Sequence, residues 1–131
     1  MMKTHQNILA TAAVFGAVAV IIGAFGAHGL KGKIASEALV SFDTGVKYQF
    51  YHVFALLATG SFFSQNPSKY LSYAAWFFAI GIVLFSGSIY FLSTREIHGL
   101  QGTLIGIVTP IGGVFFIGGW ALLAFVFSKN K

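Results

Sequence analysis

Polar residues that could carry chemistry stand at the ends of two apolar stretches. Tyr48, Gln49 and His52 follow helical spacing, so their side chains can share one face of a helix. His28 closes the preceding apolar stretch, and we expect it at a depth similar to that of His52. Two imidazoles at one depth can bind a metal or a haem iron, or pass a proton. The same residue types also serve as interfacial anchors and hydrogen-bonding groups, so a structural role stays open beside ligand binding.

The charged residues form no recognisable catalytic arrangement. Arg95 and Glu96 are adjacent, and Glu37 and Asp43 are the only other acids. No pair has the spacing of paired catalytic carboxylates, a Ser-His-Asp triad or a metalloprotease motif. The chain has no cysteine, which excludes thiolate metal sites and cysteine nucleophiles. We therefore predict a protein without enzymatic activity or catalytic residues, and the sequence leaves its cofactors and metals unidentified.

The composition excludes an ordinary water-soluble domain. Of 131 residues, 56% are hydrophobic and only 8% are charged, whereas soluble domains carry about 25% charged residues. Lipid must therefore be the solvent for most side chains, and the lipid bilayer is the first expected partner. The net charge of +5 indicates membrane topology and contact with anionic lipids. It does not indicate nucleic-acid binding, because no basic face with interleaved aromatics lies outside the apolar stretches.

Four uncharged stretches are each long enough to cross a bilayer, which takes about 20 mostly apolar residues. After the polar ends are trimmed, the predicted spans cover residues 8–29, 46–65, 71–93 and 104–127. Continuous apolar runs without alternation predict helices, because the backbone must satisfy its own hydrogen bonds in lipid. The sequence thus predicts an all-α fold, an integral membrane four-helix transmembrane bundle that forms one domain over residues 1–131.

Two further features complete the predicted topology. Residues 34–47 have apolar positions at helical spacing among polar ones, which predicts a short interfacial helix between helices 1 and 2. The first span could also be a secretory signal peptide, but its uncharged stretch is longer than such segments usually are, which favours a retained helix. Four crossings place both termini on one side, and the distribution of lysines leans towards cytoplasmic termini in a multi-pass protein.

Small residues predict close helix contacts. Ala19, Gly23 and Ala27 form one stripe at helical spacing, and Gly102 with Gly106 forms another. Helices in lipid associate by close approach of their backbones. We expect these stripes to pack helices within the bundle, against a second copy of the chain, or against other membrane proteins.

The fourth span contains a proline, which predicts a kink or a break. Pro110 lacks the amide hydrogen that would bond to the carbonyl of Gly106, and Thr109, Gly112 and Gly113 surround it. A broken helix would expose backbone groups that could contact ions or substrates. Trp120, further along this span, fits buried packing or an interfacial anchor.

Several sequence blocks resemble one known family. Residues 23–30 (GAFGAHGL) resemble the signature of small bacterial integral membrane proteins called domain of unknown function four-two-three. Further matching blocks are residues 48–52 (YQFYH), 85–90 (FSGSIY), 109–113 (TPIGG) and 119–120 (GW). The resemblance implies a four-helix protein of the bacterial cell membrane, with a mitochondrial membrane relative in animals, and no settled activity.

The resemblance also extends the candidate site. His28, Tyr48, Gln49 and His52 lie in its motifs, and Tyr90 joins them from the end of the third span, whereas His98 lies outside the pattern. Three functional hypotheses remain: a non-enzymatic accessory or scaffold protein; a small-solute, ion or lipid-handling protein that uses the polar end of the bundle; and haem or metal binding through His28 and His52.

Overall fold

The computed structural model describes residues 3–129, which form helices and connecting turns without a strand. The elements in chain order are α1 (Thr4–His28), α2 (Ser36–Gln65), α3 (Lys69–Gly81), the π-helical turn η1 (Ile82–Ser86), α4 (Gly87–Ser93), α5 (Arg95–His98) and α6 (Ile105–Lys129). The segments α3, η1 and α4 follow one another without a loop. The prediction of an all-α fold is confirmed.

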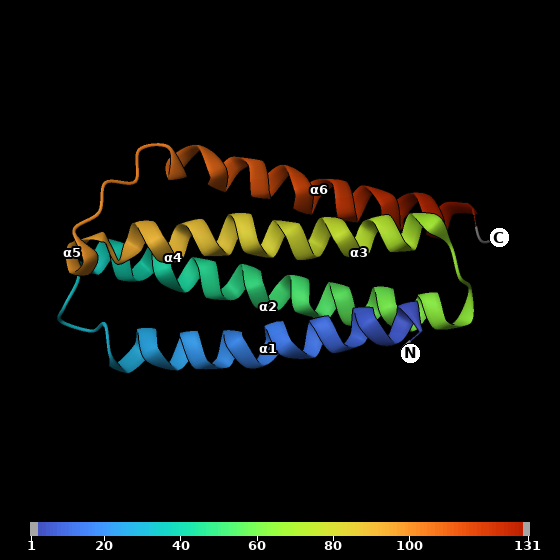
Figure 1. Cartoon of the computed structure of the whole chain (residues 1–131), viewed down its shortest axis with the longest axis horizontal. Helices are drawn as coiled ribbons and strands as arrows, with labels where there is room; N and C mark the ends of the chain where they lie inside the picture. The colour runs from blue at the N-terminus through green and yellow to red at the C-terminus, as the bar shows by residue number, and fades with distance from the viewer. Residues whose placement is uncertain (1–2, 130–131) are drawn as a thin grey trace.

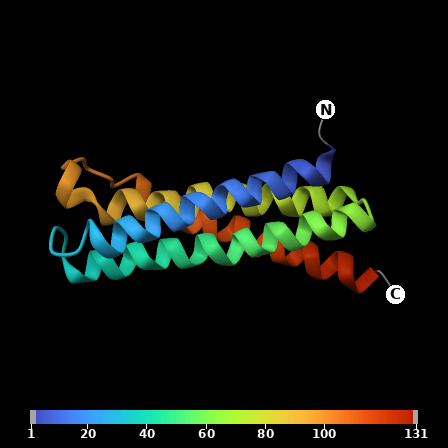
Figure 2. The ribbon, with the colours of Figure 1, turned by 90° about the horizontal axis from the view of Figure 1, so that it is seen from below.

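The long helices run side by side along one axis (Figure 1). From one side to the other the order is α1, α2, the α3–α4 column and α6, and the start of α1 lies at the same end as the end of α6. The short α5 and the two longer connections lie at the opposite end. The view from below shows α1 and α2 overlapping the other two columns, so the helices form a bundle instead of one flat layer (Figure 2).

Three helical segments are long and apolar enough to cross a membrane: α1, residues 69–93, and α6, each of 25 residues. The predicted second span, residues 46–65, lies in α2, which is less apolar and is not one of these three segments. The reason is that α2 carries buried polar side chains, among them Gln49, His52 and Thr59. The other buried polar residues in the described part of the chain, Ser86, Ser88 and Ser93, belong to the α3–α4 column, so α2 and this column supply the polar groups of the interior.

The predicted short interfacial helix is wrong. Residues 36–47 are the first turns of α2, which continues without interruption to Gln65. The apolar positions of this segment pack against protein: the ring of Phe42 lies beside Gly26 of α1, and Gly45 lies against Tyr90 of α4. A pattern of apolar and polar positions does not say whether the apolar face meets lipid or another helix, and here it meets two helices.

The helices α1 and α2 form one close antiparallel pair. A Cβ atom added to Gly23 would lie 3.2 Å from Val46, and one added to Gly16 would lie 3.4 Å from Val53. Ala19 is fully buried on the same face. Two members of the predicted small-residue stripe, Ala19 and Gly23, therefore pack inside the chain, whereas Ala27 is exposed.

The second close pair joins the α3–α4 column to α6. Gly81 lies against the ring of Phe116, and Gly119 lies against the ring of Phe78. The other predicted stripe divides here: Gly102 touches Leu92, whereas a Cβ atom on Gly106 would meet nothing within 4 Å. The core between the pairs includes the fully buried side chains of Phe78, Leu56 and Leu71, while Leu30 is fully buried in a smaller cluster with Ile34, Phe42 and Val46.

Of the two outcomes predicted at Thr109, Pro110, Gly112 and Gly113, a kink or a break, the break is wrong, because α6 runs through all four residues. Pro110 stands in the second turn of α6, where its missing amide removes a single hydrogen bond of the helical ladder. The hydroxyl of Thr109 lies 2.6 Å from that of Ser88 in α4, which ties this part of α6 to its neighbour. The proline is thus accommodated without a gap in the helix.

Two glycines of α6 allow a matched test of the close contact with the α3–α4 column. A Cβ atom on Gly112 would overlap the backbone nitrogen of Phe85 and lie 2.8 Å from its Cα atom, and backbone cannot move aside easily. Gly112→Ala should lower the free energy of unfolding by about 1–3 kcal/mol. Gly106→Ala, in open space, should leave it unchanged or slightly higher. Unfolding in mixed micelles, followed by circular dichroism, measures both, and equal effects would contradict the packing described.

Candidate functional site

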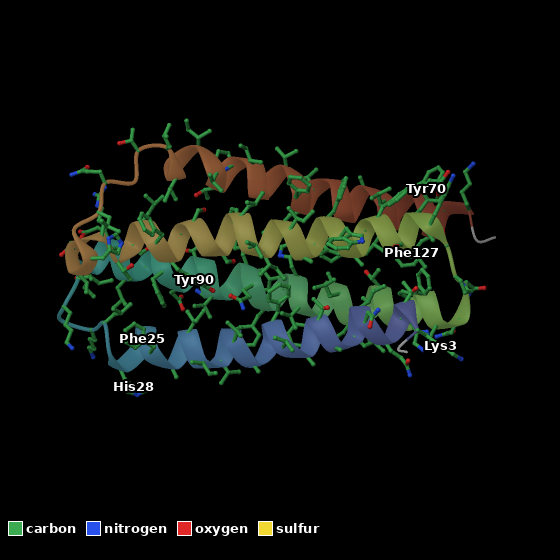
Figure 3. The ribbon with its side chains drawn as sticks, in the orientation of Figure 1. Lys3, Phe25, His28, Tyr70, Tyr90 and Phe127 are labelled. Carbon is green, nitrogen blue, oxygen red and sulfur yellow. The ribbon has the colours of Figure 1, made fainter. Side chains whose placement is uncertain are left out.

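Gln49 lies at the centre of the buried polar groups. Its side chain is 2% exposed. Its Nε2 donates to the backbone oxygen of Phe15 in α1 at 2.8 Å, and its Oε1 accepts a hydrogen bond from the Tyr90 hydroxyl in α4 at 2.6 Å. One amide of α2 thus holds two other helices, and Tyr90 is seen between the columns in Figure 3.

Two serines extend this network along the α3–α4 column. Ser86, the last residue of the π-helical turn and fully buried, donates to the backbone oxygen of Gly45 at 2.7 Å. Ser88 shares a hydrogen bond with Thr109 and also donates to the oxygen of Phe85 at 2.9 Å. The column is therefore hydrogen-bonded to α2 on one side and to α6 on the other.

His52 uses both of its ring nitrogens. Nε2 lies 3.1 Å from Nε1 of Trp120 in α6, and Nδ1 lies 2.6 Å from the backbone oxygen of Tyr48. An indole N–H can only donate, so Nε2 accepts and the proton of the neutral ring stands on Nδ1, from which it is donated to Tyr48. The ring stacks on Phe116 with centroids 3.5 Å apart and planes 5° apart. The imidazole therefore joins α2 to α6 and has no free nitrogen for a ligand.

His28 lies apart from this cluster. It is exposed at the end of α1, with Nδ1 3.1 Å from the oxygen of Ala24, and Figure 3 shows it at the edge of the bundle. The pairing of Gly23 with Val46 places His28 level with about residue 41 of α2. His52 lies roughly 16 Å further along the helix axis, at about 1.5 Å per residue. The expectation that the two histidines share one depth is wrong.

Tyr48 contributes its backbone more than its phenol to the site. Its carbonyl accepts from His52, while its half-exposed ring packs on Phe85 with centroids 4.8 Å apart. The predicted set thus divides: Gln49 and Tyr90 bond directly, His52 bonds to Trp120, and His28 stands outside. The sequence analysis did not identify Ser86 or the hydrogen bond from Trp120 to His52. The sequence signal that could have indicated them is a polar or indole group within a long apolar stretch.

In the described part of the chain, the buried polar side chains form their hydrogen bonds within the protein. Every buried side-chain nitrogen or oxygen in this part of the chain has a hydrogen-bond partner. Within residues 3–129 no group of three or more histidines, cysteines or acids could hold a metal ion. Chemically, the arrangement serves to bind four helical columns to one another, because Gln49, Ser86, Ser88 and His52 each bond to a neighbouring column, whereas His28 does not take part.

Comparison with known proteins identifies relatives over most of the chain. Residues 22–113 match the family model described as protein of unknown function (DUF423). Similar proteins include the UPF0382 membrane protein SAB0533 of Staphylococcus aureus, 44% identical over 81% of this chain and 82% of the relative. The UPF0382 membrane protein YwdK of Bacillus subtilis is 42% identical over 85% and 87%. The UPF0382 inner membrane protein YgdD of Escherichia coli is 37% identical over 92% and 88%.

No solved structure matches the chain. The resemblance inferred from residues 23–30 and the later blocks is confirmed by the family match and by these relatives. The relatives' names describe membrane proteins and state no activity.

The bond between Gln49 and Tyr90 can be tested by a double-mutant cycle. Tyr90→Phe removes the donor to the buried Oε1 of Gln49 and should lower the free energy of unfolding by about 1 kcal/mol. Combined with Gln49→Leu, it should show a coupling of similar size. Tyr73→Phe, at an exposed position of α3, is the matched control and should be neutral. If Tyr90→Phe were as mild as Tyr73→Phe in mixed-micelle unfolding, the central bond would be refuted.

Proposed function

The chain belongs to the DUF423 family of membrane proteins, and on that basis we propose that it is a non-enzymatic accessory or scaffold protein of the bacterial cell membrane. In this proposal it associates with other membrane proteins or with a second copy of itself. Membrane location is supported by the relatives' names and by three helical segments able to cross a bilayer. The cell membrane is supported by the name of the Escherichia coli relative, an inner membrane protein.

One observation carries the proposal: the buried polar groups of the described chain are occupied by one another. A transport or catalytic site in a membrane protein requires polar groups that face a cavity or a substrate. Here the amide of Gln49 and both nitrogens of His52 are bonded to the protein. Haem or metal binding through His28 and His52 gains no support, because the two rings lie at different depths. What remains available for function is the outer surface.

The outer face of α1 is the surface best suited to a protein partner. Of the three membrane-capable segments, α1 has the fewest buried residues. Its exposed side presents Ala13, Ala17 and Ala24 along one stripe, which also contains Val20, 60% exposed, and is flanked by Val14 and Ile21, 62% and 68% exposed. Alanines at helical spacing allow another helix to approach closely. This face replaces the stripe through Ala19 and Gly23, which the chain itself covers.

The proposal includes a topology in which α2 also crosses the membrane. It begins at the end of the bundle where α1 stops, and it stops where α3 begins (Figure 1). If α1 and the α3–α4 column both cross, then α2 has to return the chain to the other surface. Four crossings place both termini on one side, and the lysine distribution leans towards the cytoplasm.

Site-specific photo-crosslinking in native membranes tests the α1 face. A photo-activated residue at Ala17 should give one product of defined mass, either a dimer of the chain or a complex with one other membrane protein. The same residue at Val114 of α6, 67% exposed, is the matched control and should give only lipid adducts. Ala24→Phe should reduce the product from position 17 by about fivefold or more, because the bulkier side chain keeps the partner helix away.

The opposite result is equally clear. If positions 17 and 114 both gave only lipid adducts, or if Ala24→Phe left the product unchanged, the accessory role through α1 would be rejected.

A further inference from the structure

A cleft opens at the end of the bundle where α1 meets α2, and it touches the hydrogen-bonded network only at Thr109. It has a volume of about 610 Å³ and lies between the start of α2, the end of α4, α5 and α6. This volume is within the range of about 300–1,000 Å³ typical of small-molecule sites. Its walls include Glu37, Ser41, Ile89, Leu92, Arg95 and Thr109.

The cleft combines two opposite charges with an apolar wall. Glu37 and Arg95 both line it, and neither forms an ion pair, because the one pair among the described residues joins Lys47 to Asp43. Glu96 also lines the cleft, but its Oε1 accepts a hydrogen bond from the backbone amide of Ala35 at 3.1 Å, which fixes the start of α2. The carboxylate of Glu37 and the guanidinium of Arg95 can therefore bind a ligand, in a cleft whose wall also includes Ile89 and Leu92.

The depth of the cleft matches the boundary between hydrocarbon and lipid headgroups. The column from Lys69 to Ser93 has 25 residues, which at about 1.5 Å per residue gives a length of about 37 Å. The hydrocarbon core of a bilayer is only about 30 Å thick. A column centred on this core extends past it by roughly 3–4 Å at each end. The last turn of α4, with Leu92, then lies at the boundary of the headgroup layer, and Arg95 lies beyond it.

We propose that this cleft binds one zwitterionic phospholipid whose headgroup carries a primary ammonium beside its phosphate. Arg95 binds the phosphate, for which the guanidinium offers two parallel donors. Glu37 accepts hydrogen bonds from the ammonium, and the acyl chains lie against Ile89 and Leu92. Phosphatidylglycerol offers Glu37 only the neutral hydroxyls of its terminal glycerol in place of the ammonium, so phosphatidylethanolamine binds more tightly than phosphatidylglycerol.

Native mass spectrometry of the full chain in detergent tests this site by titration with the two lipids, matched in their acyl chains. The wild type should retain phosphatidylethanolamine in preference to phosphatidylglycerol. Glu37→Gln and Arg95→Gln should each weaken phosphatidylethanolamine binding by about tenfold, since each removes a charge-assisted contact. Asp43→Asn and Lys33→Gln are the matched controls: each removes one negative or one positive charge outside the cleft, and neither should change phosphatidylethanolamine binding.

A steric variant keeps the test decisive if a charge variant fails to fold. Ser41 is an exposed residue on the cleft wall, so Ser41→Phe fills the cleft without altering its charges and should also weaken phosphatidylethanolamine binding by about tenfold. The proposal is overturned if Ser41→Phe or the charge variants bind this lipid like the wild type. It is equally overturned if the wild type binds phosphatidylglycerol as tightly as phosphatidylethanolamine.

Discussion

A polar side chain inside a lipid-embedded bundle has to find its partner on the protein, because hydrocarbon offers none. Gln49 meets this constraint by bonding at once to the backbone of α1 and to Tyr90 of α4. Each bond fixes how far a neighbouring helix is rotated and shifted relative to α2. The remaining contacts follow this arrangement: Ser86 bonds to the carbonyl of Gly45, and Trp120 of α6 reaches the ring of His52.

Small residues make these bonds possible by bringing the helices close. Gly23 brings α1 against Val46 of α2, and Gly112 allows the backbone of α6 to touch that of Phe85. At wider spacing the short side chain of Ser86 would not reach the carbonyl of Gly45, and that of Ser88 would not reach the hydroxyl of Thr109. Close packing and hydrogen bonding therefore depend on one another, and together they hold the helices in place. The outer face of α1 and the cleft beside Arg95 are the surfaces that we propose for contact with other molecules.

Hydropathy was enough to predict the helices but not their neighbours. The predicted spans 8–29, 71–93 and 104–127 agree with α1, the α3–α4 column and α6 to within a few residues, because apolar length is a property of the sequence itself. The depth of His28 relative to His52 depends on the register of α1 against α2, which side-chain packing decides. For the same reason residues 34–47 gave a separate interfacial helix, and Pro110 a break, where tertiary contacts support continuous helices. Gln49 and Tyr90 were identified, but their bond, and the one from Trp120, required the fold.

The bond from Gln49 to α1 can be measured directly in a bilayer by solid-state NMR. With ¹⁵N in the glutamine side chains and ¹³C in the phenylalanine carbonyls, dipolar dephasing detects a glutamine nitrogen hydrogen-bonded to a phenylalanine oxygen. In the wild type the signal of Gln49, one of four glutamine side chains, should be dephased, because its Nε2 donates to the oxygen of Phe15 at 2.8 Å, and this dephasing should be lost in Gln49→Leu. Equally weak dephasing in both proteins would show that the bond from Gln49 to α1 does not form.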